Sequence, residues 1–464
     1  MYKREKYIIM TESDNLDSLI SQLGQVKQRV AKVLDLAKEL GATDTEVAMS
    51  RQQGLSVGTR LGEVENVEFT NDGALGLTVY IDGRKGSAST ADLSEQALKR
   101  AVQAAIDIAK YTSVDECSGL ADKELLAMAP ADLDLYHPKT LTTDEAIAIA
   151  KTCEDASLSY DKRITNSDGA SLACFEGFKV YGNSHGQLVG YPSSRYSLST
   201  VAIASDGDDM QRDYAYTVNR DFDALADAHT IGQQASMEVL SRLHARKIPT
   251  GKVPVLFRAD IANSIFGHFI AAISGGNLYR QSSFLLDAIG KQVFPDFLTI
   301  HERPHLTKAL ASGAFDSEGV ATVDRDIIVD GQLATYLLTS YSARKLGLTT
   351  TGNAGGIHNW LLSIKNEQHH GGDFSAMLKK LGTGLLVTEL MGQGVNVLTG
   401  DYSRGAAGFW VENGEIAYPV AEITIAGTLQ EMLKGIVAIG NDIDMRGSIR
   451  TGSVLINELQ VAGE

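Results

Sequence analysis

The sequence predicts an α+β fold, in which N-terminal helix–antiparallel sheet–helix units precede a mostly antiparallel, β-rich C-terminal domain. Three observations support this fold class. In the first half, amphipathic helical repeats alternate with short strand-like runs, and hairpin turn residues separate those runs. From Ile248 onward the composition shifts toward glycine, threonine and short strands. A chain of 464 residues is too long for one core, so we expect several domains.

The expected domain boundaries follow from these shifts. Residues 1–14 form an N-terminal extension, residues 15–245 an α+β region, and residues 246–464 a β-rich domain. The α+β region is either one domain or two units that divide near residues 114–140, where two X-Pro pairs suggest a linker.

Helices begin and end the first α+β unit. Residues 16–40 carry apolar side chains at helical spacing, and residues 96–111 show the same pattern with alanines on the inner face. Between the two helices we expect four short strands separated by glycine- and asparagine-containing turns, at residues 45–49, 55–60, 64–69 and 75–81.

The order helix, strands, helix then recurs. Thr143 and the acidic residues after it open a third helix that ends near Leu158, and alternating strands follow over residues 162–205. Asp221 is a candidate N-cap for a fourth helix over residues 222–244.

The last third of the chain is predicted to form β-hairpins with few helices. An Asp-Gly turn at residues 330–331 and an Asn-Gly turn at residues 413–414 each lie between two strand-like runs. The helices expected here are short, at residues 376–381 and 429–434.

Charge and composition exclude several classes of protein. A formal net charge of −16, without a lysine and arginine cluster, argues against direct nucleic-acid binding. The three cysteines, Cys117, Cys153 and Cys174, form no CxxC pair, which favours a reducing cytoplasm over a disulfide framework. No apolar run approaches the ~18 residues of a membrane span.

The rest of the chain is organised around residues 253–276. An apolar strand over residues 253–257 leads into an apolar helix, for which Asp260 is the expected N-cap. His268 is the only titratable side chain within that helix. A single histidine in an apolar helix is more often a hydrogen-bonded core residue than a metal ligand.

Two short segments match catalytic motifs, but the residues around them oppose the local structure that each motif needs. Residues 182–186 match G-x-S-x-G around Ser184, but glycine and proline follow where a nucleophile elbow needs a helix, so we expect a hairpin turn. His301 and His305 match H-E-x-x-H, but Pro304 opposes a helix. In a strand two residues four apart are separated by ~13 Å, too far to chelate one zinc.

Three further segments have ordinary structural explanations. Residues 342–345 match S-x-x-K without its companion motifs, and are expected to form a helix surface. His369 and His370 lie in a polar loop and are expected to be solvated. The glycine-rich loop at residues 349–356 either approaches a ligand closely or is a plain connector.

The order of five longer segments resembles the TldD/PmbA family, the "modulator of DNA gyrase" proteins, and is most similar to its PmbA branch, also called TldE. The resemblance runs from about Leu16 to the C-terminus. It is carried by NSIFGH (263–268), FDSEG (315–319), TTTGNAGG (349–356), GQGVNVLTGDYSRGAAGFWVENGEI (392–416) and IGNDIDMRGSIRTGS (439–453).

The resemblance implies a cytoplasmic metalloprotease assembled from a TldD-type and a PmbA-type subunit. Such an assembly digests unfolded or flexible peptides, and acts in peptide-antibiotic maturation and antitoxin breakdown. In the TldD branch, zinc is held by His-Glu-x-x-x-His and by a cysteine near the C-terminus.

Aligned residue by residue, that motif falls on Asn263, Ser264 and His268, and no cysteine follows Asn441. A catalytic zinc needs three protein ligands, and a metal-bound water needs a base. We therefore expect no catalytic residue, metal or other cofactor in this chain. It is expected to be inactive alone and to act as the partner of a zinc-containing TldD-type subunit.

Two alternatives stay open. The chain is a self-sufficient metallopeptidase if His268, His301 and His305 converge on a metal. It is a regulatory binding protein if it acts on gyrase or another partner without proteolysis. Expected partners are a TldD-type subunit and flexible peptides, with a homodimer when the chain is alone, and neither nucleic acid nor a membrane.

Overall fold

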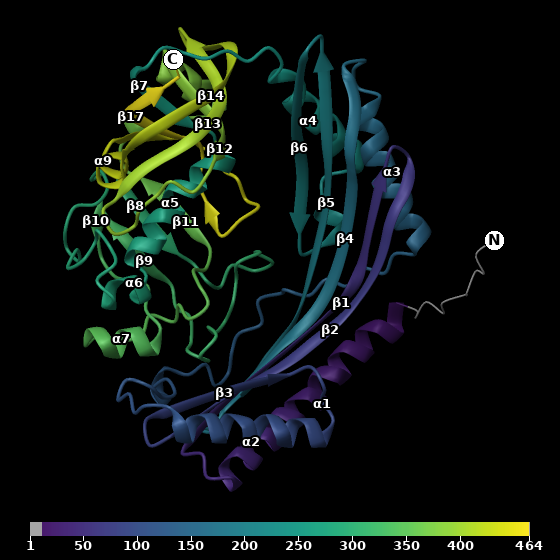
Figure 1. Ribbon diagram of the computed structural model, residues 1–464, viewed down its shortest axis with the longest axis vertical. Coiled ribbons are helices and arrows are strands. Elements are labelled where there is room, and N and C mark those ends of the chain that lie inside the picture. Colours follow the sequence, from purple (N-terminus) through teal and green to yellow (C-terminus); the bar gives the residue numbers. More distant parts are fainter. Residues whose placement is uncertain (1–11, 464) are drawn as a thin grey trace. The chain divides into compact units, whose positions relative to one another are not determined.

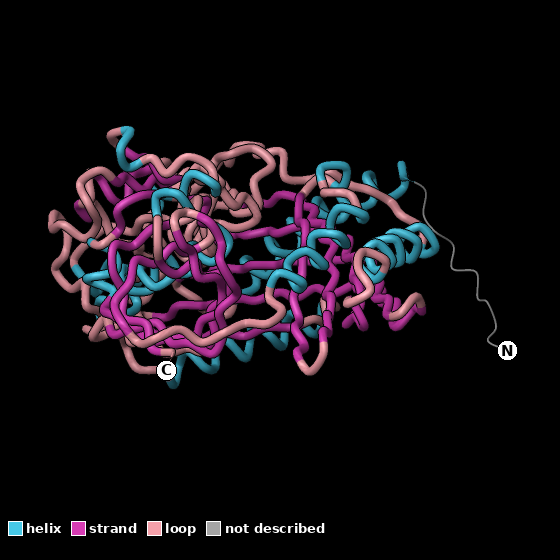
Figure 2. Tube along the Cα trace, turned by 90° about the horizontal axis from the view of Figure 1, so that it is seen from above, coloured by secondary structure: helices cyan, strands magenta, loops and turns pink. Residues whose placement is uncertain are grey.

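The structure is a computed structural model that describes residues 12–463. The chain divides into two compact units, Met1–Leu240 and Ser241–Glu464 (Figure 1). Both units combine helices with largely antiparallel strands, and the second is rich in strands, so the predicted α+β class is confirmed. Figure 2 shows the strands in magenta and the helices in cyan. Across residues 12–463, no helix combines the length and apolar character needed to cross a bilayer.

The first unit is built on one six-stranded sheet in the order β3-β2-β1-β4-β5-β6. Every neighbouring pair in this sheet is antiparallel. The strands are β1 (Asp44–Arg60), β2 (Glu63–Ile81), β3 (Arg84–Thr90), β4 (Ile164–Asn183), β5 (Leu188–Asp206) and β6 (Asp209–Asn219). The hairpin expected around Ser184 is confirmed, since it joins β4 to β5.

The prediction of four short strands within residues 45–81 is wrong, because β1 and β2 are each one long strand. Pairing between β1 and β2 continues through the residues predicted to form turns, where Gln53 pairs with Asn71 and Arg51 pairs with Gly73. Gly54 stays in the strand because β4 passes so close that a Cβ there would meet the Cys174 carbonyl oxygen at 2.1 Å. Glycine here marks close approach of two strands and not a turn.

Four helices accompany this sheet: α1 (Glu12–Glu39), α2 (Glu95–Tyr111), α3 (Thr143–Leu158) and α4 (Ala228–Ser241). The third helix matches its prediction, and its Thr142–Glu145 capping box explains the sharp start. The fourth helix was predicted too long. Asp221 caps only a short 3₁₀ turn, and Asp227 accepts the Thr230 N–H at the start of α4.

The second unit contains two sheets. One has the order β14-β13-β12-β7-β17-β15, and an added pairing of β14 with β17 closes five of its strands into a ring. The other has the order β10-β9-β8-β11-β16. The strands are β7 (Gly251–Phe257), β8 (Leu298–Glu302), β9 (Arg325–Val329), β10 (Gln332–Leu333), β11 (Trp360–Ile364), β12 (Gly384–Met391), β13 (Asp401–Glu412), β14 (Glu415–Thr428), β15 (Ile436–Ile439), β16 (Ile449–Arg450) and β17 (Val454–Ala462).

Five helices belong to this unit, and α5 lies in its core. They are α5 (Ala259–Ile273), α6 (Gly275–Tyr279), α7 (Ser340–Leu346), α8 (Phe374–Leu381) and α9 (Leu429–Lys434). Phe269 of α5 is fully buried, with its ring centroid 4.9 Å from Phe294 and 6.0 Å from Trp360. Burial of one such side chain contributes about 1.5–3 kcal/mol, so α5 is held firmly.

The N-cap predicted for α5 is wrong by two residues. Arg258 occupies the cap position, and Asp260 lies in the first turn. The Asp260 carboxylate accepts two hydrogen bonds from the Arg258 guanidinium, at 2.8 and 2.9 Å. A carboxylate in the first turn still favours the helix through its dipole.

Candidate functional site

Helix α5 carries all three positions of the degenerate motif. Asn263, Ser264 and His268 are each partly exposed, whereas the neighbouring Ile265, Phe266 and Phe269 are fully buried. The Ser264 hydroxyl donates to the Ile261 carbonyl at 2.7 Å, within its own helix. This local bond within the helix satisfies the hydroxyl proton.

His268 differs from its two companions, because part of its ring is buried without a hydrogen bond. The Nε2 atom is buried and has no protein partner. The ring packs edge-on against Tyr402 of β13, with centroids 5.9 Å apart. Burial lowers the pKa of His268, and the nearby Arg404 guanidinium lowers it further. The imidazole is therefore neutral near pH 7.

Tyr402 is a second buried polar group at the same place. Burial raises the pKa of its hydroxyl to about 12, an effect that Arg404 partly offsets. Arg404 lies close, but no hydrogen bond of ordinary geometry reaches the buried hydroxyl oxygen. His268 Nε2 is thus left without a hydrogen bond, whereas the Tyr402 hydroxyl has the Arg404 side chain beside it.

The donor set on α5 does not fit a catalytic zinc. Such a site takes three imidazole, carboxylate or thiolate ligands, with water in the fourth position. The motif offers one imidazole, one amide and one hydroxyl. Over residues 12–463, no three or more histidine, cysteine, aspartate or glutamate side chains gather in a way that could hold a metal.

His301 lies on β8 in a relay that the sequence did not reveal. Its Nδ1 is 2.6 Å from Asp326 Oδ1 on β9, and its Nε2 is 2.7 Å from the Ser363 hydroxyl on β11. Burial alone would raise the pKa of Asp326, but hydrogen bonds from His301 and Arg303 hold it below its ordinary value. The arrangement has the order of a serine, histidine and aspartate relay.

The position of Ser363 argues that this relay is a cross-strand pairing and not a nucleophile site. The His301 Nδ1–H donates to Asp326, and the Arg303 guanidinium, which can only donate, gives its own hydrogen bond to the same carboxylate at 3.1 Å. Ser363 lies within strand β11, directly opposite Thr299, and not on an exposed turn.

His305 belongs to a separate network. Its Nε2 is 3.0 Å from the Thr322 hydroxyl, which itself donates to the Gly313 carbonyl at 2.6 Å. The imidazole therefore donates to Thr322. His301 and His305 belong to separate hydrogen-bond networks and His268 packs against Tyr402, so among the described residues the three do not form a metal-binding group.

Two buried carboxylates form a second cluster, with the glycine-rich loop bound to both. Asp316 accepts the N–H groups of Glu318, Val320 and Ala354 at 2.9–3.0 Å. Burial nevertheless raises its pKa to about 6. The carboxyl is therefore partly protonated in mildly acidic solution.

Glu302, which is 1% exposed, secures the other end of the loop. Its Oε1 accepts the side-chain amide of Asn353 and the His358 N–H, both at 2.9 Å. Its Oε2 lies 3.7 Å from Arg325 Nε. Residues 351–354 are thus buried and bound, while Gly355 and Gly356 are exposed. Most of this loop serves the protein interior and not a ligand.

The remaining sequence candidates have local roles. Ser342 completes the capping box of α7 with Thr339. His369 stacks on Phe297, with ring centroids 3.9 Å apart. Ser184 is in the β4–β5 turn, where its hydroxyl donates to Asp44 at 3.2 Å.

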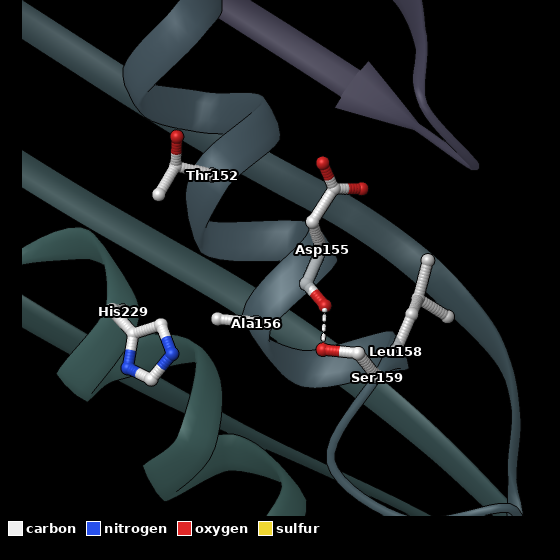
Figure 3. Close-up of a pocket in the computed structure, with 6 residues that line it drawn as sticks. All are labelled: Thr152, Asp155, Ala156, Leu158, Ser159 and His229. Carbon is white, nitrogen blue, oxygen red and sulfur yellow. Dashed lines mark hydrogen bonds between the residues drawn. The ribbon is translucent and has the colours of Figure 1, made fainter.

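A shallow hollow of about 580 Å³ lies in the first unit between α3 and α4 (Figure 3). It is lined by Thr152, Asp155, Ala156, Leu158, Ser159 and His229. The hydrogen bond drawn there joins the Ser159 hydroxyl to the Asp155 backbone carbonyl at 2.6 Å, within one helix. His229 comes from the other helix and is exposed. The lining shows no set of convergent catalytic groups.

Three family models cover most of the chain. Residues 45–109 match PmbA/TldA metallopeptidase domain 1, residues 136–243 match the central domain, and residues 250–463 match the C-terminal domain.

Whole-length relatives carry the same family name. Metalloprotease PmbA of Escherichia coli O157:H7 is 57% identical over 449 residues, which cover 96% of this chain and 99% of the relative. The Metalloprotease PmbA homolog of Haemophilus influenzae is 54% identical over 455 residues, covering 98% and 100%.

Solved structures agree at the level of the fold. A Bacteroides thetaiotaomicron protein named as a modulator of DNA gyrase superposes with a TM-score of 0.88 at 30% identity, covering 94% of this chain and 99% of its own. TldE from Thermococcus kodakarensis gives a TM-score of 0.77 at 19% identity, covering 94% and 100%. At that identity the second match concerns the fold alone.

Proposed function

The chain belongs to the PmbA/TldD metallopeptidase family, on its PmbA side, and from this premise we propose that it is the non-zinc-binding subunit of a two-subunit peptidase. A TldD-type partner supplies the metal and the chemistry. This chain completes and shapes the chamber in which unfolded or flexible peptides are cut. Peptide-antibiotic maturation and antitoxin breakdown are the proposed settings.

One observation carries this proposal. At the position of the family's zinc motif, α5 presents the amide of Asn263 and a Ser264 hydroxyl that is bonded within its own helix. Neither group can replace an imidazole ligand or a carboxylate base. A family member with an intact fold and without these groups is suited to assist a catalytic subunit.

The cysteines support the proposed cytoplasmic location. Cys117, Cys153 and Cys174 are not joined in disulfides, and burial raises the pKa of Cys153 and of Cys174 to about 12. Protonated, buried thiols of this kind are inert side chains of the core. They suit a reducing compartment, in which free thiols persist.

Reconstitution tests the proposed role. Degradation of an unfolded peptide is measured for this chain, for a TldD-type subunit, and for the two mixed. We expect cutting by the mixture and background cutting by this chain alone. Stoichiometric zinc together with peptide cutting by the lone chain would instead establish a self-sufficient metallopeptidase.

A matched variant distinguishes a supporting role of this chain from a direct part in peptide cutting. Asn263, Ser264 and His268 are all changed to alanine in this chain, which is then mixed with the unaltered partner. We expect the activity of the mixture to stay within about twofold, a change smaller than the removal of a catalytic group produces. A loss of a hundredfold or more would mean that these side chains take part in the reaction.

The second candidate is regulatory binding, which the name of the Bacteroides thetaiotaomicron structure favours. Affinity capture with this chain, against purified gyrase and a TldD-type subunit in parallel, distinguishes the two. Retention of gyrase without the TldD-type subunit would favour regulation.

A further inference from the structure

The outer half of strand β2 is a free sheet edge. Strand β3 pairs with β2 only from Leu75 to Ile81. From Glu63 to Ala74, β2 pairs with β1 on one side, and no other described strand pairs with it on the opposite side. Alternate backbone N–H and C=O groups along this stretch point outward and can accept another strand.

Apolar side chains continue to this edge without being covered. Phe69, Val64 and Val67 are 66%, 41% and 39% exposed. They lie directly opposite Leu55, Thr59 and Val57 of β1, all of which are buried. Residues opposite each other in a sheet share a face, so the covered apolar face of β1 extends onto an uncovered strip of β2.

The same stretch also carries negative charge. Glu63 and Glu68 lie opposite Arg60 and Ser56, on the face away from the apolar strip. Glu65 falls at the register shift between Gly58 and Thr59, where a β-bulge leaves it without an opposite residue. All three glutamates are exposed. The edge is therefore apolar on one face and acidic on the other.

A buried carboxylate holds this edge in position. Glu154 of α3 is fully buried, and it accepts the N–H groups of Leu61 and Gly62 at 2.7 and 3.3 Å. Leu61 and Gly62 form the β1–β2 turn, with φ angles of 50° and 77°. The turn is thus fixed to α3, and a strand that adds to β2 meets a pre-organised edge.

We propose that residues 63–74 of β2 bind an extended segment of another polypeptide by strand addition. The segment carries lysine or arginine on the face toward the glutamates, and apolar side chains beside Val67 and Phe69. Main-chain hydrogen bonds supply affinity in such complexes, and side chains at alternate positions supply specificity. The inference does not depend on the peptidase role proposed above.

The negative charge of this edge favours binding of a different polypeptide over pairing with a second copy of this chain. Antiparallel pairing of this edge with itself would bring glutamates close to glutamates, and like charges opposite each other destabilise a sheet. The net charge of −16 adds repulsion between copies. Acidic residues on an edge oppose self-association, but they attract a basic strand.

The test uses the full chain and two blocked probe peptides about as long as the edge. One alternates valine with lysine, and the other alternates valine with glutamate. At physiological salt we expect the lysine peptide to bind about tenfold more tightly, from a few cross-strand charge pairs. Hydrogen exchange should show new protection within residues 63–74 when the lysine peptide is bound.

Charge reversal at the edge provides the decisive variant. Glu63→Lys, Glu65→Lys and Glu68→Lys together should reverse the preference, so that the glutamate peptide binds more tightly. The matched control reverses three exposed glutamates elsewhere, with Glu39→Lys, Glu116→Lys and Glu124→Lys, and should keep the preference of the original chain. Thermal unfolding checks that both variants fold.

Three outcomes would overturn the proposal. The first is equal loss of preference in the two triple variants, which would mean that net charge alone governs binding. The second is protection that falls outside residues 63–74. The third is a dimer of the unaltered chain in sedimentation that Phe69→Lys dissociates, which would make a second copy the occupant.

Discussion

Two places in the second unit hold buried polar groups, and they differ in how those groups are satisfied. Around Glu302 and Asp316, carboxylate oxygens accept from several backbone and side-chain N–H groups. Only Arg325 Nε, 3.7 Å from Glu302, is buried there without a hydrogen bond among the groups named. Beside α5, His268 Nε2 is buried without a hydrogen bond. The carboxylates of the first place stabilise the fold, whereas the unsatisfied nitrogen of the second lowers its stability.

The difference indicates which buried polar groups the fold depends on. A buried carboxylate that accepts several hydrogen bonds is costly to remove, because each donor then loses its partner. A buried polar group without a partner makes no hydrogen bond, so its removal loses no hydrogen-bond energy. In this chain helix α5 carries an amide, a hydroxyl and one imidazole with few partners, while the loops around the carboxylates keep a hydrogen-bonded interior.

The largest effect is expected at Glu302. Replacing Glu302 by alanine removes the acceptor for Asn353 and His358, and leaves the partly buried Arg325 without its nearest carboxylate. We expect the free energy of unfolding of the second unit to fall by about 3 kcal/mol. Denaturant unfolding measures it. The exposed Glu415→Ala is the control, and should change stability by less than ~0.5 kcal/mol. Equal effects in the two variants would contradict a bonded cluster.

A smaller, pH-dependent effect is expected at Asp316. Its pKa is about 6 when folded and has an ordinary value of 3.8. Between these values the folded chain retains a proton that the unfolded chain has released. Stability is therefore lost as pH rises through this window, by up to about 3 kcal/mol at 1.36 kcal/mol per unit.

The variant Asp316→Asn isolates this contribution, because it has no proton to release. We expect the stability of the original chain, measured relative to the variant, to be highest near pH 4 and to decline toward pH 6. Urea unfolding at a series of pH values checks this. A difference that stays constant with pH would show that the three N–H bonds keep the carboxylate ionised throughout.

The smallest effect, and one of opposite sign, is expected at His268. Replacing His268 by leucine removes a buried nitrogen that has no partner, so we expect stability to rise by up to ~1 kcal/mol. The neighbouring Ser264→Ala should be within ~0.5 kcal/mol of the original chain, since it loses only a bond within its helix. A loss of stability comparable to that of Glu302→Ala would remove the contrast between the two places.

Much of the fold was predictable because local signals were strong. Residues 143–158 and 429–434 were placed correctly, since caps and apolar spacing both mark their ends. The lengths of β1 and β2 were not predictable. Gly54 and Gly73 looked like turn residues, and only pairing with strands distant in sequence keeps them extended.

The candidate site also has some features that the sequence shows and others that it does not. The identities of Asn263 and Ser264, on which the proposed non-zinc-binding role depends, are visible in the sequence because these residues belong to one short segment. The partners of His301 and Glu302 are not, since Asp326, Ser363 and Asn353 come from other strands and loops. Nothing in the local pattern indicated that Asp316 would be buried, or that the glycine-rich loop would bind it.

The amino-acid sequence by itself determined the fold class and the family, because both depend on residue identity and short-range spacing. Only the tertiary structure decided which buried polar groups are satisfied and which sheet edge stays open. Those properties depend on strand register and burial, which bring together residues far apart along the chain.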